Sequence, residues 1–389
     1  MNDSALTLPG RLAHFARTTP NQTALRVKRL GIWQPITWSE YLDEVTACAL
    51  MLAQWGIGED DHVAILSDNR PEWLFADLGA QLLEARSVGV YQTNPPQDVA
   101  YVVDHSRSRV VFAEDQEQVD KLLEIKDRCP SLETIVFDDS RGMRNYGQSF
   151  LKSFDAVQQV GRDYDAANPG FFDDAVAAAT GADTAIMLYT SGTTGQPKGA
   201  ELSHNNIVMN VMTVGILFPE RHTEIQLVAL PLFHVYAQTC LMHMGLYTGD
   251  TLVLMQRFEP GAAMTLITDT GVTRFAGVPT MYQAFLEHPD FDHEQAKRLA
   301  ETVGAVSTGG APMPHAVAEA FTARTGIAMM EGYGCTETSP VVLVTPPDEE
   351  RREGSVGPAI WGVEARIVDS HGTALATNEA GIVQLEALV

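Results

Sequence analysis

Residues 189–199, which read Y-T-S-G-T-T-G-Q-P-K-G, combine glycines, hydroxyl side chains and one lysine in a short stretch. Glycines let an anion approach the main chain closely, and backbone N–H groups and hydroxyls supply hydrogen-bond donors. Lys198 adds a mobile positive charge, and Pro197 stiffens the end of the stretch. This combination predicts a loop that binds a polyphosphate.

Two other interpretations of this stretch agree less well with its spacing. A P-loop has the pattern G-x-x-x-x-G-K-[ST], but Gly199 follows Lys198 where Ser or Thr would stand. A flexible Gly/Ser/Thr linker rarely carries a single Lys and Pro directly after an apolar strand, which residues 184–188 predict. Because Ser203 can cap a helix over residues 206–217, we expect the loop to join a buried strand to a helix.

Residues 331–337, E-G-Y-G-C-T-E, place two glycines around an aromatic side chain and a hydroxyl next to a carboxylate. An aromatic face can stack on a purine, and Thr336 with Glu337 could hold a hard cation such as Mg²⁺. We expect this segment at the carboxyl edge of a sheet, where open α/β sheets bind ligands. Taken alone, the segment fits a threonine helix cap beside a solvated glutamate better.

Two further segments lie near the ends of predicted strands. Residues 307–314, S-T-G-G-A-P-M-P, follow a strand and precede a helix, and such a turn is as often structural as functional. Residues 230–238, L-P-L-F-H-V-Y-A-Q, hold His234 beside an apolar run, where a histidine is more often a core residue than a catalyst. The residues alone leave the roles of both segments open.

Taken together, these segments resemble the signatures of the adenylate-forming superfamily, which includes acyl-CoA synthetases, luciferases and peptide-synthetase adenylation domains. Residues 189–199 are similar to its phosphate loop, Y-G-x-T-E at 333–337 to its second signature, and residues 230–238 to a third segment. The resemblance implies that Tyr333 contacts adenine, Thr336 contacts phosphate and Glu337 binds Mg²⁺. It also implies that His234 lies at the mouth of a carboxylate pocket.

The site residues implied by the resemblance fall into three groups. The catalytic group is Lys198, His234, Thr336 and Glu337. The group that binds nucleotide and substrate is Thr190, Ser191, Gly192, Thr193, Thr194, Gly195, Lys198, Gly199, Val235, Gln238, Gly310, Ala311, Glu331, Gly332, Tyr333 and Thr336. The metal group is Thr193 and Glu337. Some long-chain members carry a Trp at the position of Gln238 that gates the acyl tunnel, so this gating is not expected here.

Residues 69–73 (N-R-P-E-W) and 89–104 resemble the fatty-acid branch of the acyl-CoA synthetases, so the resemblance extends over about residues 12–389. It implies a fatty acyl-CoA ligase for medium to long chains. Such an enzyme uses ATP and Mg²⁺ to form an acyl-adenylate and pyrophosphate, and then transfers the acyl group to CoA. The family's ribose-binding aspartate, its hinge and its small C-terminal domain with a lysine have no counterpart in this sequence, so we expect the isolated chain to be impaired.

Three alternatives stay open beside the fatty acyl-CoA ligase. The chain could be a fragment that binds ATP and fatty acid without turning them over. It could be a luciferase-like oxidoreductase on the same fold. It could also be an adenylation domain that loads a carrier protein instead of CoA.

The composition limits the partners of the protein. The chain has 389 residues, of which 45% are hydrophobic and 20% charged, as in an ordinary soluble globular protein. Its net charge of −24 argues against nucleic acid as the main partner. Four cysteines without C-x-x-C spacing favour reduced thiols and a cytoplasmic location, and residues 1–11 show no signal-peptide pattern. Peripheral membrane contact and a homodimer are compatible with the resemblance.

Alternating strand and helix patterns run through most of the chain, which predicts parallel sheets covered by helices. Strands are predicted at 23–27, 62–66, 87–91, 110–113, 134–137, 184–188, 226–230, 251–255, 274–277 and 303–307. Helices are predicted at 11–18, from a cap at Ser39 to Gly56, and at 71–83, 97–104, 116–126, 206–217, 237–246, 260–268, 281–286 and 314–325. The uncharged stretch 225–249 is interrupted by Pro231, His234 and Gln238, which favours a buried strand, loop and core helix over a membrane span.

These elements predict an α/β fold of two doubly wound subdomains with mainly parallel sheets, followed by the start of a small β-barrel-like subdomain. The first subdomain is expected at 1–181, and residues 140–181 should form a partly helical connection. The second, with the phosphate loop, is expected at 182–353. Residues 354–389 should form an incomplete β subdomain with strands at 364–368 and 382–385, and the family's C-terminal domain is expected to be absent.

Overall fold

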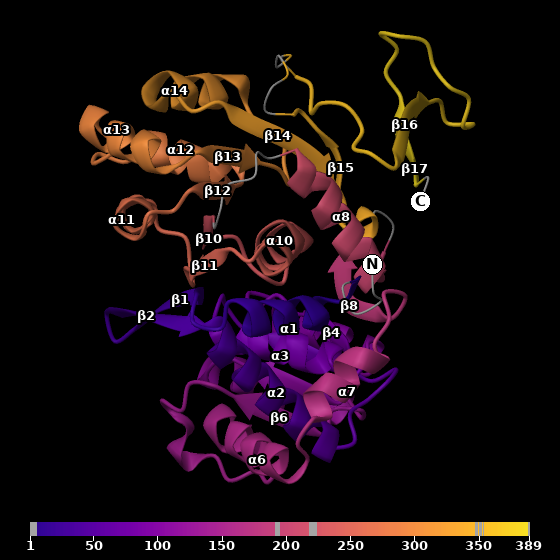
Figure 1. Cartoon of the computed structure of the whole chain (residues 1–389). Coiled ribbons are helices and arrows are strands. Elements are labelled where there is room, and N and C mark those ends of the chain that lie inside the picture. Colours follow the sequence, from indigo (N-terminus) through magenta and orange to yellow (C-terminus); the bar gives the residue numbers. More distant parts are fainter. Residues whose placement is uncertain are drawn as a thin grey trace.

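Two large β-sheets and a separate hairpin organise the protein, and helices cover the sheets (Figure 1). The computed structural model describes residues 6–190, 195–217, 224–346, 349, 352 and 354–387. The expected α/β class with mostly parallel sheets is confirmed.

The first sheet has seven strands, and only its last pair, β8 and β9, runs antiparallel. In spatial order the strands are β7 (Leu151–Ser153), β6 (Thr134–Phe137), β5 (Val110–Ala113), β3 (His62–Leu66), β4 (Arg86–Gly89), β8 (Thr184–Thr190) and β9 (Lys198–Ser203). Alternate side chains of a strand point to opposite faces, so Val63 and Ile65 join one hydrophobic core and Ala64 and Leu66 another. Both faces of this sheet are therefore buried.

Helices cover both faces of the first sheet. The helices are α1 (Leu8–Thr18), α2 (Trp38–Gln54), α3 (Pro71–Gln81), α4 (Pro96–His105), α5 (Gln116–Ile125), α6 (Phe154–Ala167) and α7 (Phe171–Ala178), with the short η2 (Lys126–Arg128) and η3 (Met143–Asn145). Helix α2 packs on α3 and α6, and α4 packs on α5. The expected cap of α2 at Ser39 is wrong: Thr37 accepts from the Glu40 amide at 3.2 Å, and the Glu40 carboxylate accepts from the Thr37 amide at 2.7 Å.

The second sheet has eight strands, and only the pairs at its two ends run antiparallel. In spatial order they are β15 (Val341–Val344), β14 (Met329–Gly334), β13 (Ala305–Thr308), β12 (Arg274–Gly277), β10 (Ile225–Val228), β11 (Thr251–Leu254), β1 (Thr23–Arg29) and β2 (Ile32–Thr37). Phe275 of β12 packs against Tyr282 of α12, with 5.6 Å between the ring centroids.

Two groups of helices accompany the second sheet. On the side of Phe275 lie α11 (Pro260–Thr270), α12 (Pro279–Glu287), α13 (His293–Thr302) and α14 (His315–Thr325). The other group is α8 (His204–Ile216), α9 (Val235–Ala237), the π-helix η4 (Gln238–His243) and α10 (Met244–Thr248), which pack on one another. In Figure 1, α10 lies beside β10 and β11, and α8 lies beside β15.

The two sheets exchange strands across the expected subdomain boundary at residue 181. Strands β1 and β2 belong to the second sheet, whereas β8 and β9 belong to the first. Sheet membership therefore does not follow the division at 1–181 and 182–353, because adjacent strands in space come from distant parts of the chain. The boundaries of the subdomains as separate units stay a prediction.

Several elements differ from those predicted. The expected helix at 237–246 is divided into α9, η4 and α10, and β2, β7, β9, β15 and α13 were not predicted. The connection at 140–181 is partly helical, as expected, because it contains α6 and α7. Strands β16 (Val363–Val368) and β17 (Ile382–Ala387) pair antiparallel in a separate hairpin near the predicted positions. Across the described ranges, no helix combines the length and the apolar composition that crossing a membrane requires.

Candidate active site

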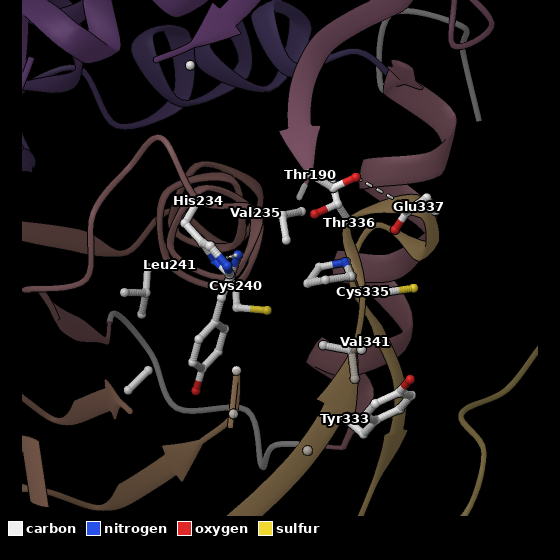
Figure 2. Close-up of a pocket in the computed structure, with 18 of the residues that line it drawn as sticks. Thr190, His234, Val235, Cys240, Leu241, Tyr333, Cys335, Thr336, Glu337 and Val341 are labelled. Atoms are coloured by element: carbon white, nitrogen blue, oxygen red, sulfur yellow. Dashed lines mark hydrogen bonds between the residues drawn. The ribbon is translucent and has the colours of Figure 1, made fainter. Parts of the chain in front are cut away.

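A cavity of about 760 Å³ lies where segments of the two sheets meet, and Figure 2 shows part of its lining. One wall comes from β8, β9 and α4, and another from α9, η4 and α10. The remaining lining comes from β4 and the segment after it, from α8, and from β10, β12, β13, β14 and β15 with the turns that follow β13 and β14. Of the residues predicted from sequence, the cavity brings together Thr190, Lys198, His234, Val235, Gly310, Gly332, Tyr333, Thr336 and Glu337.

A hydrogen bond links the two segments that carried the strongest sequence signals. Thr190, the last residue of β8, donates from Oγ1 to Oε1 of Glu337 at 3.3 Å, as the dashed line in Figure 2 marks. Glu337 lies on the short helix η5 (Thr336–Thr338), directly after β14. The start of the predicted phosphate loop therefore lies beside the carboxylate predicted to bind metal.

The predicted phosphate loop joins two paired strands. Thr190 of β8 and Lys198 of β9 are register partners, so the two ends of the loop lie opposite each other. The predicted residues Ser191, Gly192, Thr193 and Thr194 lie outside the described residues. Gly195 and Gly199 are described but do not line the cavity. The loop thus joins the two strands of a hairpin, and the strand at its exit, β9, was not predicted because Lys, Gly, Ala and Glu are weak strand formers.

Helix α4 supports the exit of this loop. The hydroxyl of Tyr101 donates to the carbonyl oxygen of Pro197 at 2.8 Å, immediately before Lys198. His105, one turn further along α4, shares a 2.8 Å hydrogen bond with the hydroxyl of Tyr189 in β8. Sequence reasoning missed this support, although Tyr101 and His105 have the four-residue spacing that places both on one helix face.

The segment around Tyr333 opens toward the cavity. Tyr333 is 41% exposed near the end of β14, and Gly310 has a φ of +77°, which favours glycine. A Cβ at Gly334 would lie 2.0 Å from the carbonyl oxygen of Pro340, so a larger residue would displace Tyr333 or β15. This geometry leaves the face of an aromatic ring available beside small residues.

Besides Gly195 and Gly199, three more predicted binding residues do not line the cavity. Glu331 accepts a hydrogen bond from the amide of Met313 at 3.1 Å and so fastens the turn after β13 to β14. Ala311 lies in that turn, outside the lining. Gln238 is fully buried, and its Nε2 donates to Oδ1 of Asp77 in α3 at 3.2 Å. The expectation that Gln238 lies in the pocket is wrong, because it faces α3 while Cys240 and Leu241 face the cavity.

The titratable groups of this wall are held neutral. Nδ1 of His234 accepts from the Tyr236 amide at 3.2 Å, and burial lowers the pKa of His234. Burial raises the pKa of the Cys240 thiol to about 12, and it raises the pKa of Tyr236, whose hydroxyl lies 3.4 Å from Oγ of Ser307. A neutral imidazole and a protonated thiol can orient a substrate, but the thiol cannot serve as a nucleophile near neutral pH.

The donor set at Thr190 and Glu337 fits a magnesium ion. It offers a hydroxyl and a carboxylate oxygen, and Mg²⁺ prefers oxygen ligands and is often held by one or two carboxylates with water and substrate phosphates. In the part of the chain that the structure describes, no cluster of three or more His, Cys, Asp and Glu side chains could hold a metal alone. Thr193, the other predicted ligand, lies outside the described residues.

The cavity also extends to the amino ends of the strands. Gln226 of β10, Arg274 of β12 and Ala305 of β13 line it there. These residues were not predicted from the sequence, because ligands of parallel sheets usually bind at the carboxyl ends of the strands. The sequence signal that could have identified them is a polar residue near the start of a buried strand, as at Gln226 and Arg274.

Comparisons with known proteins agree on one family. The family described as AMP-binding enzyme matches residues 12–385. Feruloyl-CoA synthase from an Amycolatopsis species is 36% identical over 200 residues, which cover 51% of this chain and 40% of that protein. A long-chain-fatty-acid–CoA ligase from Bacillus subtilis (strain 168) is 27% identical over 368 residues, covering 90% of this chain and 63% of that protein. The chain therefore spans less than two thirds of either relative.

The fold is also similar to that of a solved structure. The anthranilate CoA ligase AuaEII in complex with anthranoyl-AMP superposes with a TM-score of 0.86 and 23% sequence identity. The match covers 98% of this chain and 70% of that one. This likeness shows the fold of the described residues.

Proposed function

The chain belongs to the AMP-binding enzyme family, and on this premise we propose that it activates a carboxylic acid with ATP to give an acyl-adenylate and pyrophosphate. The whole protein would then transfer the acyl group to CoA as an acid–thiol ligase. The observation that carries the proposal is the hydrogen bond between Thr190 and Glu337, which brings a phosphate-loop end and a carboxylate together at one cavity.

Adenylate formation requires positioned charges more than a protein nucleophile. The acid carboxylate attacks the α-phosphate, so the anions must be screened and held in line. Lys198 and the N–H groups of its loop would screen the phosphates, and Thr336 would contact them. Mg²⁺ bound by Glu337 would neutralise part of the charge on the departing pyrophosphate.

The other walls would hold the base and the acid. The exposed ring of Tyr333 would stack on adenine beside Gly310 and Gly332. His234 uses Nδ1 as an acceptor, which leaves the proton of the neutral ring on Nε2, where it can donate to the acid carboxylate. Val235 would contact the first carbons of the acyl group.

The acyl group that we propose is a fatty acyl chain of medium to long length. Support comes from the apolar side chains Leu241, Met244 and Val341 in the cavity, and from the matched B. subtilis ligase. The matched feruloyl-CoA synthase makes an aromatic acid the second candidate substrate. A cytoplasmic location, a homodimer and peripheral membrane contact stay predictions.

The acyl acceptor can be tested directly. Residues 1–389 and a longer protein that adds the family's C-terminal domain would be incubated with Mg·ATP, radiolabelled decanoate and either CoA or a phosphopantetheinyl carrier protein. We expect acyl-CoA from the longer protein and much less from residues 1–389. Acylation of the carrier protein alone would contradict the CoA ligase. Light emission or oxygen consumption would favour a luciferase-like enzyme, and ATP binding without any product from either protein would indicate a binding fragment.

A further inference from the structure

The far end of the cavity is formed by three residues in register. Gln226 pairs with Arg274, and Arg274 pairs with Ala305, across the neighbouring strands β10, β12 and β13. Arg274 and Ala305 are the first residues of their strands, and all three line the cavity. The cavity therefore runs along one face of the second sheet, from its carboxyl edge to its amino edge.

The side walls of this passage are apolar. Val214 of α8, Leu241 of η4 and Met244 of α10 line it, together with Ala276 and Ala305 of the sheet. Ala276 lies two residues after Arg274, so both share one face of β12. Small residues on the sheet leave room between it and the helices.

The side chains at the far end of the cavity are polar, and they form hydrogen bonds and ion pairs with neighbouring residues. Nε2 of Gln226 donates to Oδ2 of Asp250 at 2.5 Å. The guanidinium of Arg274 lies 4.0 Å from Asp250 and 3.8 Å from Glu224. Gln226, Asp250 and Glu224 are 1%, 2% and 3% exposed. An acyl chain that reached this group would bury methylenes against charges that have little access to water.

We infer that Gln226 and Arg274 form a polar stop that limits the acyl group to about ten carbon atoms, so the substrate lies at the medium-length end of the proposed range. We place the acid carboxylate near Gly309, which lines the cavity at the carboxyl end of β13. Gly309 follows Ala305 by four residues, which at about 3.3 Å per strand residue span about 13 Å. With C–C bonds of about 1.5 Å, a zigzag chain advances roughly 1.3 Å per carbon. This inference rests on the proposed function.

Longer chains would meet a specific obstacle. A sixteen-carbon chain would extend roughly 20 Å, well past Arg274. To pass, it would have to separate Gln226 from Asp250 and strip solvation from the ion pairs of Arg274, which is unfavourable for buried charges. The stop therefore discriminates by chain length, because longer chains must disrupt these contacts.

Calorimetry with residues 1–389 tests the chain-length limit by measuring binding, so catalytic turnover is not required. Saturated acids from hexanoate to tetradecanoate would be titrated into the protein. We expect the affinity to rise about fourfold per added methylene up to about ten carbons, and to fall at least tenfold from decanoate to tetradecanoate. An affinity that keeps rising through tetradecanoate, or no binding of any acid, would overturn the stop.

Three variants distinguish an effect of the stop on the chain-length profile from a general effect on protein stability. Gln226→Ala should move the best acid to a longer chain, because it shortens the stop. Ala305→Leu should move it to a shorter chain, because it fills space in front of Arg274. Gln159→Ala, which removes an amide bonded to Asp163 on the exposed side of α6, should leave the profile unchanged. If Gln226→Ala does not fold, Ala305→Leu decides: an unshifted profile in that variant overturns the inference.

Measurements of acid binding and adenylate formation distinguish a failure of the proposed function from a failure of the stop. Acids that bind with the expected length profile but support no adenylate formation, even in the longer protein, would contradict the proposed activity and leave the stop in place. Adenylate formation from hexadecanoate at the rate seen with decanoate would overturn the stop and leave the activity in place.

Discussion

The hydroxyl of Thr190 lies 3.3 Å from Oε1 of Glu337, although 147 residues separate them in the chain. Thr190 ends strand β8 of the first sheet, and Glu337 follows strand β14 of the second sheet. Glu337 is exposed, so this hydrogen bond contributes little to folding. Its consequence is geometric, because it places the end of β8 beside the segment that follows β14 at the candidate site.

Glu337→Gln should reduce adenylate formation at least about a hundredfold, because it removes the charge that Mg²⁺ prefers while keeping the shape of the side chain. The free energy of unfolding should change by less than about 0.5 kcal/mol, since the residue is exposed. Steady-state rates at several Mg²⁺ concentrations and urea unfolding measure the two effects. Glu319→Gln on the exposed side of α14 is the matched control. Unchanged rates with the same Mg²⁺ dependence would show that Glu337 is only a solvated turn residue.

Tyr101→Phe should weaken Mg·ATP binding about three- to tenfold, because one hydrogen bond to the Pro197 carbonyl is worth about 0.5–1.5 kcal/mol. The Kd from calorimetry should change while the affinity for the acid does not, since the contact supports the phosphate loop. Tyr146→Phe removes a hydroxyl that bonds Asp120 and Gln116, outside the cavity lining, and serves as the control. Equal Mg·ATP affinities in the wild type and Tyr101→Phe would show that Tyr101 does not support nucleotide binding.

His204 should make the protein less stable in acid. Burial at the first residue of α8 lowers its pKa to about 4, and its Nδ1 accepts from the Leu8 amide at 3.3 Å. The unfolded chain takes up this proton near pH 6.5, whereas the folded chain resists it until about pH 4. Between these values the unfolded state binds more protons, so stability falls as pH falls, by up to about 1.4 kcal/mol per pH unit.

Urea unfolding of the wild type and His204→Asn at pH 7, 6 and 5 measures this effect. The variant lacks the titrating group, so the stability difference between the two proteins should shrink toward pH 5. His371→Asn, on an exposed turn, is the control. Parallel stability curves for the wild type and His204→Asn would contradict the assignment.

Gly161→Ala should lower the free energy of unfolding by at least about 1 kcal/mol, although alanine normally stabilises a helix by about 1 kcal/mol relative to glycine. A Cβ at this position would lie 1.9 Å from the Ala47 carbonyl oxygen, so α6 would have to move away from α2. Gly215→Ala is the matched control in α8, where the nearest atom is the Met244 sulfur at 3.9 Å, and it should be neutral or stabilising. Stabilisation by both substitutions would show that the contact between α2 and α6 adapts easily.

The sequence predicted the elements whose pattern is local. Apolar runs marked β3, β5 and β8, and Ser203, predicted as a helix cap, marked the start of α8. It could not predict that β8 pairs with β4 while β1 pairs with β11, because pairing depends on packing between distant segments. The same limit explains why sheet membership does not follow the predicted boundary at residue 181.

The sequence predicted only the part of the candidate site that holds the proposed phosphate, adenine and metal contacts. Thr190, Lys198, Tyr333 and Glu337 carry distinctive spacing and lie together at the cavity. Gln238 was misplaced because a π-helix replaces the expected regular helix, and periodicity cannot reveal which side then faces the ligand. Binding roles for all these residues stay predictions.

ATP–pyrophosphate exchange by residues 1–389, measured with Mg·ATP, labelled pyrophosphate and a panel of carboxylic acids, tests the proposed activity directly. We expect exchange that requires an apolar acid, is greatest near decanoate and falls at least about a hundredfold in Glu337→Gln. A folded protein that shows acid-independent exchange, or no exchange with any acid either alone or within a longer protein, would contradict the proposed activity.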